Sequence, residues 1–297
     1  MNTKIKALIA LLVTVLIWSV HAIISRTLIQ MEPPMLLSLL RMSTAALLFL
    51  PFILKTRPWK KENFVQLVAV SCLSAANVFF FMWGIQYTTA SVGQLIYAAI
   101  PVMMVLVNIF ILKEKISTGK ITGVLLGFAG LTYIFYLSLA EKGLTITGHF
   151  IGNIAIFTAT ICWLWYIIFS KKLTKYFSPI EIGGVAAIVT CFINFFLAIF
   201  EYKFTQRVGT WNLLSVLGGL YMGVGGTFLA YIFYQYAIKI VSTLTVSLSS
   251  YIQPITTAIF ASMLIGEKLT PKYILGSALV FSGIFLTTTL EVYKRRK

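Results

Sequence analysis

Two sets of polar and aromatic residues recur at helical spacing in this chain, and their side chains suit the binding of a small organic molecule. In the first set, Trp18 and His21 are three residues apart, and Thr14 and Ser25 lie four residues before and after them. These steps place all four side chains on one face of a helix. The second set lies 145 residues further on: Ala159, Trp163, Tyr166 and Ser170. On helices that are otherwise apolar, we expect both faces to avoid lipid and to point into a bundle or a cavity.

Further stretches extend this pattern. Gln94, Tyr97, Pro101 and Asn108 share one helical face, at steps of three, four and seven residues. The other positions are Ser247, Ser250, Tyr251 and Pro254 in a similar helix, and Asn77, Phe81, Ala230 and Tyr234 in a third pair of helices. Polar side chains are costly in hydrocarbon, so they indicate helix contacts or the path of a solute. We expect the following residues to bind the solute: Trp18, His21, Asn77, Gln94, Tyr97, Trp163, Tyr166, Tyr234, Ser250 and Tyr251.

The elements that carry these residues are predicted to be membrane-spanning helices. Of the 297 residues, 59% are hydrophobic and 11% are charged, whereas soluble domains carry about a quarter charged residues. A net charge of +16 would suggest a nucleic-acid partner in a soluble chain, but here the basic residues lie in short loops between apolar runs, so none is expected. About twenty apolar residues are needed to cross a bilayer as a helix. Ten runs meet this length: Ala7–Ile24, Met35–Leu54, Phe64–Gly84, Ser91–Leu112, Ile121–Leu139, Phe150–Phe169, Ile180–Phe200, Leu213–Ile238, Ser242–Ile265 and Tyr273–Leu290.

The chain also contains an internal repeat with a constant offset of 153 residues. Five positions agree between the copies: Pro101, Glu114, Lys115, Gly123 and Gly130 match Pro254, Glu267, Lys268, Gly276 and Gly283. Each copy consists of an apolar helix with a proline, a short loop with Glu-Lys and a second apolar helix with spaced glycines. We therefore predict a first repeat of five helices over residues 1–140, a hydrophilic connection over 141–149 and a second repeat of five helices over 150–297.

The distribution of positive charge predicts the orientation in the membrane. Lysine and arginine favour the cytoplasmic side, and 17 of the 24 lie at the two chain ends and in one set of alternating loops, against 6 in the other loops. Both termini are therefore expected in the cytoplasm. Because each repeat has an odd number of helices, the second must cross the membrane in the opposite sense to the first. The predicted fold is an all-α integral membrane protein of ten transmembrane helices, arranged as two inverted five-helix repeats in the cell (inner or plasma) membrane.

Some residues within these helices have a structural interpretation beside a functional one. Pro101 and Pro254 are expected to kink their helices, and a kink where the two halves cross can also serve as a hinge. Arg41 lies about two turns into its helix; it either extends to the outer surface or anchors a carboxylated solute. Four glycines of the predicted fifth and tenth helices are expected to act in hinges or in close packing: Gly123, Gly130, Gly276 and Gly283.

The scarcity of acidic residues limits the chemistry further. The chain has no aspartate, and its glutamates lie at helix ends or in loops. Proton-driven carriers usually need a carboxylate within the membrane, so His21 is the deep titratable candidate, and downhill transport is favoured over proton coupling. The cysteines lie in apolar runs without metal-site spacing, and the sequence has no Walker-type glycine loop. We therefore expect no metal ion, no cofactor and no catalytic residue.

Several motifs together suggest a family. Each half carries an early tryptophan, a mid-helix proline, a loop with Glu-Lys and a last helix with two glycines seven residues apart, and the loops read Leu-Lys-Glu-Lys-Ile at 112–116 and Ile-Gly-Glu-Lys-Leu at 265–269. With these features the chain resembles the EamA family of the drug/metabolite transporter superfamily over nearly its whole length. Arg41 after Pro33-Pro34 also matches this family, whereas the second half has Ala186 near the equivalent position. The resemblance implies ten helices, export of small metabolites such as amino acids, and a cavity lined mainly by helices 1, 3, 4, 6, 8 and 9.

The expected function is secondary transport, with a small-molecule solute and membrane lipids as partners; the sequence leaves the oligomeric state open. The aromatic residues on the matched faces suit an amphipathic solute, and the resemblance implies export of small metabolites such as amino acids. The inverted repeats predict alternating access, with the solute site between them. A nucleotide-sugar carrier of the same fold is an alternative, although the absence of paired deep basic residues argues against highly phosphorylated solutes. A membrane-embedded lipid-modifying enzyme would need clustered carboxylates, and a scaffold protein would not need matched polar faces.

Overall fold

The computed structural model describes residues 2–111, single residues and short stretches between 122 and 136, residues 149–266 and residues 271–294. Every regular element in these ranges is helical. The first half contains α1 (Thr3–Leu28), α2 (Pro34–Thr56), η1 (Pro58–Lys60), α3 (Phe64–Gly84), η2 (Ile85–Tyr87), α4 (Ala90–Tyr97) and α5 (Ile100–Phe110). The second half contains α7 (Phe150–Leu173), α8 (Pro179–Thr205), α9 (Leu213–Gly223), η3 (Val224–Leu229), α10 (Ala230–Ile240), α11 (Thr243–Leu248), η4 (Ser249–Tyr251), α12 (Ile252–Ile265) and α13 (Pro271–Lys294).

Eight spans in the described part of the chain are long and apolar enough to cross a membrane. They correspond to the first four predicted runs and to the sixth through ninth, so the prediction of an all-helical, multi-pass membrane protein is confirmed. The tenth run falls in α13, where Ile274–Gly283 is a shorter apolar segment. The fifth run is described only in part. The loop at 112–120, the connection at 141–148 and the loop at 267–270 lie outside the described residues.

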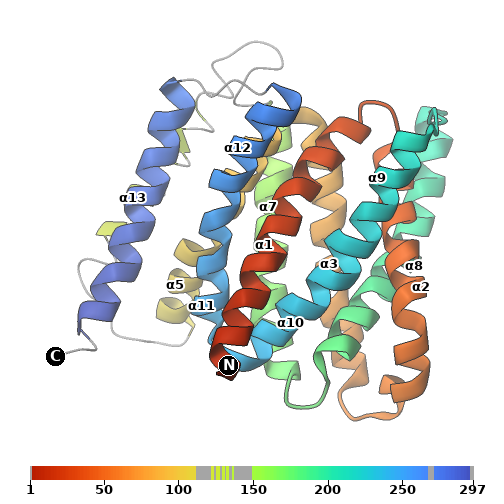
Figure 1. Ribbon diagram of the computed structural model, residues 1–297, viewed down its shortest axis with the longest axis horizontal. Helices are drawn as coiled ribbons and strands as arrows, with labels where there is room; N and C mark the ends of the chain where they lie inside the picture. Colours follow the sequence, from red (N-terminus) through yellow and green to blue (C-terminus); the bar gives the residue numbers. More distant parts are fainter. Residues whose placement is uncertain are drawn as a thin grey trace.

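The helices stand beside one another, and the start of α1 lies at the same end of the bundle as the end of α13 (Figure 1). Helices of the two halves are interleaved. The first helix, α1, packs against α9, α10 and α12, while α2 packs on α8, and α3 packs on α7 and α8. The interior of the bundle therefore lies between elements of both halves.

The fourth and ninth of the ten predicted helices are each interrupted near a proline. The fourth divides into α4 and α5 at Ala98 and Ala99, shortly before Pro101, and the ninth changes to the 3-10 turn η4 shortly before Pro254. Proline has no N–H to donate to the carbonyl four residues earlier, which in these spans belongs to Tyr97 and to Ser250. The carbonyl groups left without this donor therefore belong to two residues, Tyr97 and Ser250, that the sequence analysis placed on polar helix faces.

The glycines of the predicted fifth and tenth helices meet backbone to backbone. A Cβ atom on Gly130 would lie 2.7 Å from the backbone nitrogen of Val280 and 2.9 Å from the carbonyl oxygen of Gly276. A Cβ atom on Gly283 would overlap the backbone at Gly123. Residue numbers rise along one partner as they fall along the other, so the two helices run antiparallel where they touch.

Carboxylates at helix ends join the two halves of the chain. Glu32, in the turn after α1, accepts hydrogen bonds from the backbone N–H of Trp211 at 2.8 Å and from the hydroxyl of Ser215 at 2.6 Å, at the start of α9. At the other end of the bundle, Lys61 forms an ion pair of 2.6 Å with Glu181, in the first turn of α8. These contacts hold α8 and α9 against the first half and so position the walls of the interior.

Candidate functional site

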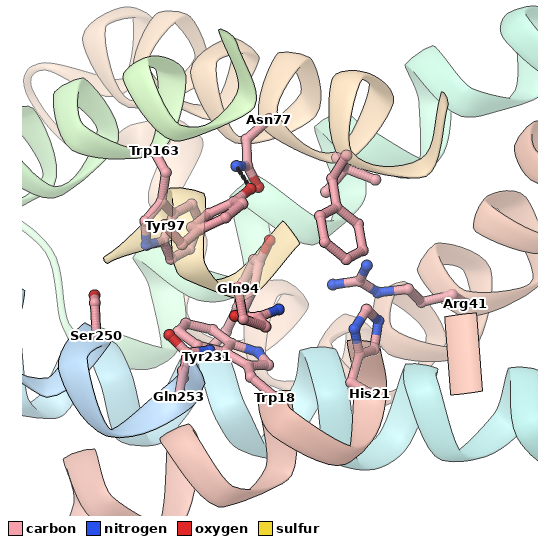
Figure 2. Close-up of a pocket in the computed structure, with 12 residues that line it drawn as sticks. Trp18, His21, Arg41, Asn77, Gln94, Tyr97, Trp163, Tyr231, Ser250 and Gln253 are labelled. Carbon is pink, nitrogen blue, oxygen red and sulfur yellow. Dashed lines mark hydrogen bonds between the residues drawn. The ribbon is translucent and has the colours of Figure 1, made fainter. Parts of the chain in front are cut away.

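A cavity lies inside the bundle, where helices of both halves meet (Figure 2). Its volume is about 60 Å³, several times the space that one water molecule needs. Its walls come from α1, α2, α3, α4, α7 and α10, and from the segment η4–α12. The lining residues are Trp18, His21, Arg41, Asn77, Val78, Phe81, Gln94, Tyr97, Trp163, Tyr231, Ser250 and Gln253. A cavity of this kind, lined by polar and aromatic side chains inside a bundle of apolar helices, is typical of a solute site.

The structure brings most of the residues that we expected to bind solute to this one cavity. Those in its lining are Trp18, His21, Asn77, Gln94, Tyr97, Trp163 and Ser250. The other three lie outside the lining. Tyr166 and Tyr234 are almost fully buried among other aromatic rings, and the hydroxyl of Tyr251 is buried without a hydrogen-bond partner.

An aromatic cluster forms one side of the cavity. The rings of Trp18 and Trp163 meet edge to face, with centroids 5.5 Å apart, although 145 residues separate them in the sequence. Tyr234 packs on both tryptophans, with centroid distances of 4.9 and 5.5 Å. Tyr166 stacks on the far side of this group against Trp163 at 4.9 Å, and its hydroxyl accepts a hydrogen bond of 2.9 Å from Gln235. The cluster gives the cavity a rigid apolar wall with π faces.

A π-helical turn, η3, contacts three of the lining side chains. The wider turn lies between α9 and α10, and π-helical turns often occur at functional sites. The carbonyl oxygen of Gly226 in this turn accepts a hydrogen bond of 2.9 Å from the indole of Trp18. A Cβ atom on Gly226 would lie 2.6 Å from the imidazole carbon Cδ2 of His21, so glycine is needed there for the histidine to occupy its place. The hydroxyl of Thr227 accepts a hydrogen bond of 2.7 Å from Nε of Arg41.

Arg41 is buried in the cavity wall, with 5% of its surface exposed. Its side chain reaches from α2 into the interior and ends beside His21 (Figure 2). It therefore points into the bundle and does not extend to the outer surface. That it anchors a carboxylated solute stays a prediction. Arg41 and His21 lie at one side of the cavity and Trp163 and Ser250 at the other (Figure 2). The ring of Phe81 packs near the imidazole of His21, with centroids 6.0 Å apart.

Polar side chains from α3, α4 and α12 complete the lining. The amide of Asn77 donates to the carbonyl oxygen of Ala159 at 2.9 Å and to the hydroxyl of Tyr97, which ties α3 to α7 and α4. Gln94 lies near the centre of the view in Figure 2, and its Oε1 atom has no hydrogen-bond partner. Gln253, which directly precedes Pro254, lies close by in the lining. These groups can donate and accept hydrogen bonds, and no cluster of metal ligands occurs among the described residues.

Sequence reasoning missed three lining residues: Val78, Tyr231 and Gln253. The hydroxyl of Tyr231 lies 3.0 Å from that of Ser74, and each sits in an apolar helix. The signal for Gln253 was present in the sequence, because an amide next to a mid-helix proline is a polar residue at an interrupted turn. Tyr231 had no such signal, since Tyr234 on the same helix fitted the polar pattern equally well.

Comparisons with known proteins agree with this architecture. A sequence profile of the EamA-like transporter family matches residues 5–136 and 150–289. A protein of Bacillus subtilis (strain 168) named uncharacterized transporter YoaV is 24% identical, over 99% of this chain and 99% of its own. An uncharacterized transporter of Archaeoglobus fulgidus is 22% identical over 95% and 98% of the two chains. A WAT1-related chloroplastic protein of Arabidopsis thaliana is 22% identical over 92% of this chain and 67% of its own. One crystal structure superposes with a TM-score of 0.68 at 17% identity and covers 96% of each chain, which shows a shared fold.

Proposed function

Because the chain belongs to the EamA-like transporter family, we propose that it is a secondary transporter that exports small amphipathic metabolites, such as amino acids, across the cell membrane. The observation that carries this proposal is the polar cavity between helices of both halves. Its aromatic wall, built on Trp18 and Trp163, suits the apolar body of such a solute. The polar side around His21 and Gln94 suits a hydrogen-bonding headgroup. Movement is downhill in this proposal, because no carboxylate lines the cavity in the described part of the chain.

The proposed mechanism is alternating access by two inverted five-helix repeats, 1–140 and 150–297, connected through 141–149. The glycine contacts of the last helices support this arrangement. Gly130 meets Gly276, and Gly283 meets Gly123. Adding 153 to the positions of the first repeat gives those of the second, so exchanging the repeats converts one contact into the other. Such an exchange is expected for a two-fold axis in the membrane plane, which relates inverted repeats and passes near the solute site.

The inverted arrangement predicts that two equivalent loops face opposite sides of the membrane. Single cysteines at Thr118 and Lys272 are the probes, in a background from which the native cysteines have been replaced: Cys72, Cys162 and Cys191. In intact cells, an impermeant thiol reagent should label the second probe and not the first, because the distribution of lysine and arginine places residue 118 in the cytoplasm. In permeabilised cells both should be labelled. Equal labelling of the two probes in intact cells would contradict the inverted repeat.

Solute binding and flux test the function itself. Purified protein is first screened for thermal stabilisation by metabolites, and the stabilising solutes are then tested for counterflow in proteoliposomes. A transporter is expected to show both, and counterflow should persist without an ion or pH gradient if transport is downhill. Turnover of a lipid substrate, with no stabilisation and no flux of any metabolite, would instead favour a membrane-embedded enzyme.

A nucleotide-sugar carrier is a weaker candidate for this site. Pyrophosphate groups carry several negative charges, and carriers of such solutes need more than one cation to bind them. Among the described residues that line the cavity, Arg41 is the one lysine or arginine. A solute with a single anionic group fits this lining better.

A further inference from the structure

The cavity contains a buried cation, Arg41, and no carboxylate in the described part of the chain lies beside it. The ion pair of the described residues is the one between Lys61 and Glu181, at an end of the bundle, so no described carboxylate lies within 4.0 Å of Arg41. Glu32 and Glu201 are engaged elsewhere, with the backbone N–H groups of Trp211 and Met35 respectively. A buried charge is costly unless it is paired and hydrogen-bonded. A buried arginine in this position is therefore stabilised when an anionic solute binds beside it.

The side chain of Arg41 is oriented for such an anion. Its Nε atom is already used, because it donates to the hydroxyl of Thr227 at 2.7 Å. This bond fixes the plane of the guanidinium group and leaves the Nη atoms at the cavity end of the side chain (Figure 2). A guanidinium edge of this kind matches the two oxygens of a carboxylate and can donate to both.

Two neighbouring side chains have unused polar atoms. Nε2 of His21 and Oε1 of Gln94 are buried, and neither has a hydrogen-bond partner. Both residues line the cavity with Arg41. An imidazole N–H can donate to an anionic oxygen, whereas an amide oxygen accepts from an ammonium or a hydroxyl group. A buried polar atom without a partner is unfavourable, so a solute that supplies the missing partners is stabilised by binding here.

We propose that Arg41 is the carboxylate-binding residue of the solute site, with His21 as a second donor to the carboxylate and Gln94 as the acceptor for an α-ammonium group. The substrate class is monocarboxylates with an apolar or aromatic body, and α-amino acids with apolar side chains satisfy all three groups. The body lies toward Trp163, on the side of the cavity opposite Arg41, where Trp18 meets Trp163 edge to face. This inference rests on the proposed transport function and specifies its solute.

The test compares solutes that differ at the carboxylate only. Purified full-length protein is melted with each apolar and aromatic amino acid at millimolar concentration, with the corresponding decarboxylated amine and with the corresponding amide. At least one amino acid should raise the melting temperature, and its amine and amide should not. The subsite is overturned if no amino acid of the set stabilises the protein, or if an amine or amide stabilises it as well as the acid does.

Variants of Arg41 then assign the effect to this residue. Arg41→Gln should raise the half-saturating concentration of the stabilising acid at least tenfold. Arg41→Lys keeps the positive charge but loses the two parallel N–H donors of the guanidinium group, so it should raise that concentration less. The matched control is Arg26→Gln, because Arg26 lies near the end of α1 and donates to the carbonyl oxygen of Gln86 at 3.2 Å, outside the cavity lining. Unchanged affinity in Arg41→Gln would overturn the assignment.

The outcome for the subsite can be separated from the outcome for the proposed function. Flux of amines or neutral solutes through wild-type protein, without carboxylate dependence, would refute the carboxylate subsite and leave the transporter in place. Absence of flux for every solute in the set would refute the proposed function, whatever the binding result. If Arg41→Gln fails to fold, the comparison of acid, amine and amide on wild-type protein still decides the question.

Discussion

Replacing Gly283 with alanine is expected to lower the melting temperature of the purified protein by several degrees, and Gly130→Ala should do the same. A Cβ atom on Gly283 would overlap the backbone of the facing helix at Gly123 and Gly127, and backbone atoms cannot move aside as the end of a flexible side chain can. Inserting a methyl group into a filled contact typically costs about 1–3 kcal/mol. The two variants are expected to lower the melting temperature by similar amounts, because Gly130 and Gly283 are equivalent positions of the repeat and have similar surroundings.

The matched control for these variants is Gly225→Ala. The nearest atom to a Cβ at that glycine is Cε2 of Tyr221 at 3.5 Å, an ordinary van der Waals distance, so the melting temperature should stay close to that of the wild type. Intrinsic tryptophan fluorescence during heating provides the measurement. Wild-type melting of both Gly283→Ala and Gly130→Ala would mean that the two last helices do not meet at these glycines.

The positions of the helices could be predicted from the sequence because membrane burial acts on each run separately. A run such as Pro34–Thr56 is long and on average strongly apolar even though it contains Arg41, so its existence does not depend on how its neighbours pack. The interruptions near Pro101 and Pro254 could be anticipated for the same reason, since the missing N–H is a property of the residue itself.

The rotation of each helix about its own axis was harder to predict. Polar spacing identified Trp18 and His21 as one face, and this face does line the cavity. The same reasoning selected Tyr234 in the eighth predicted helix, where Tyr231 of α10 lines the cavity instead. The π-helical turn η3 lies just before these residues and adds a residue to the turn, which changes the direction in which the following side chains point. Nothing in a regular 3.6-residue period signals such an insertion.

Packing between helices also decides which side chains of a polar face reach the cavity, and the residue spacing within one helix does not predict this packing. Tyr166 occupies the position equivalent to His21 in the second half, and both were expected to face the solute. In the structure Tyr166 is fully buried, stacks on Trp163 and accepts a hydrogen bond from Gln235, whereas His21 lines the cavity. The two equivalent positions therefore have different surroundings, although they lie on equivalent faces.

Replacing His21 with alanine is expected to reduce transport about tenfold or more while the melting temperature stays near that of the wild type. The side chain lines the cavity, and its Nε2 atom has no hydrogen-bond partner in the protein, so truncation removes no internal hydrogen bond of that atom. The space it leaves is continuous with the cavity and can fill with water. A solute, in contrast, loses one hydrogen bond from a charged group, worth about 1.5–3 kcal/mol, and each 1.4 kcal/mol corresponds to about tenfold.

Tyr166 is expected to show the opposite pattern and is the internal comparison for His21. Tyr166→Ala should lower the melting temperature first, because removal of a large buried aromatic side chain costs about 3–5 kcal/mol. Tyr166→Phe keeps the stacking on Trp163 and loses only the hydrogen bond from Gln235, so it should retain most of the transport. Both assays use proteoliposome counterflow of a solute already shown to bind, beside thermal unfolding of the same preparation. If His21→Ala transports that solute at the wild-type rate, the solute does not pass the histidine, and the path through the bundle runs along other residues.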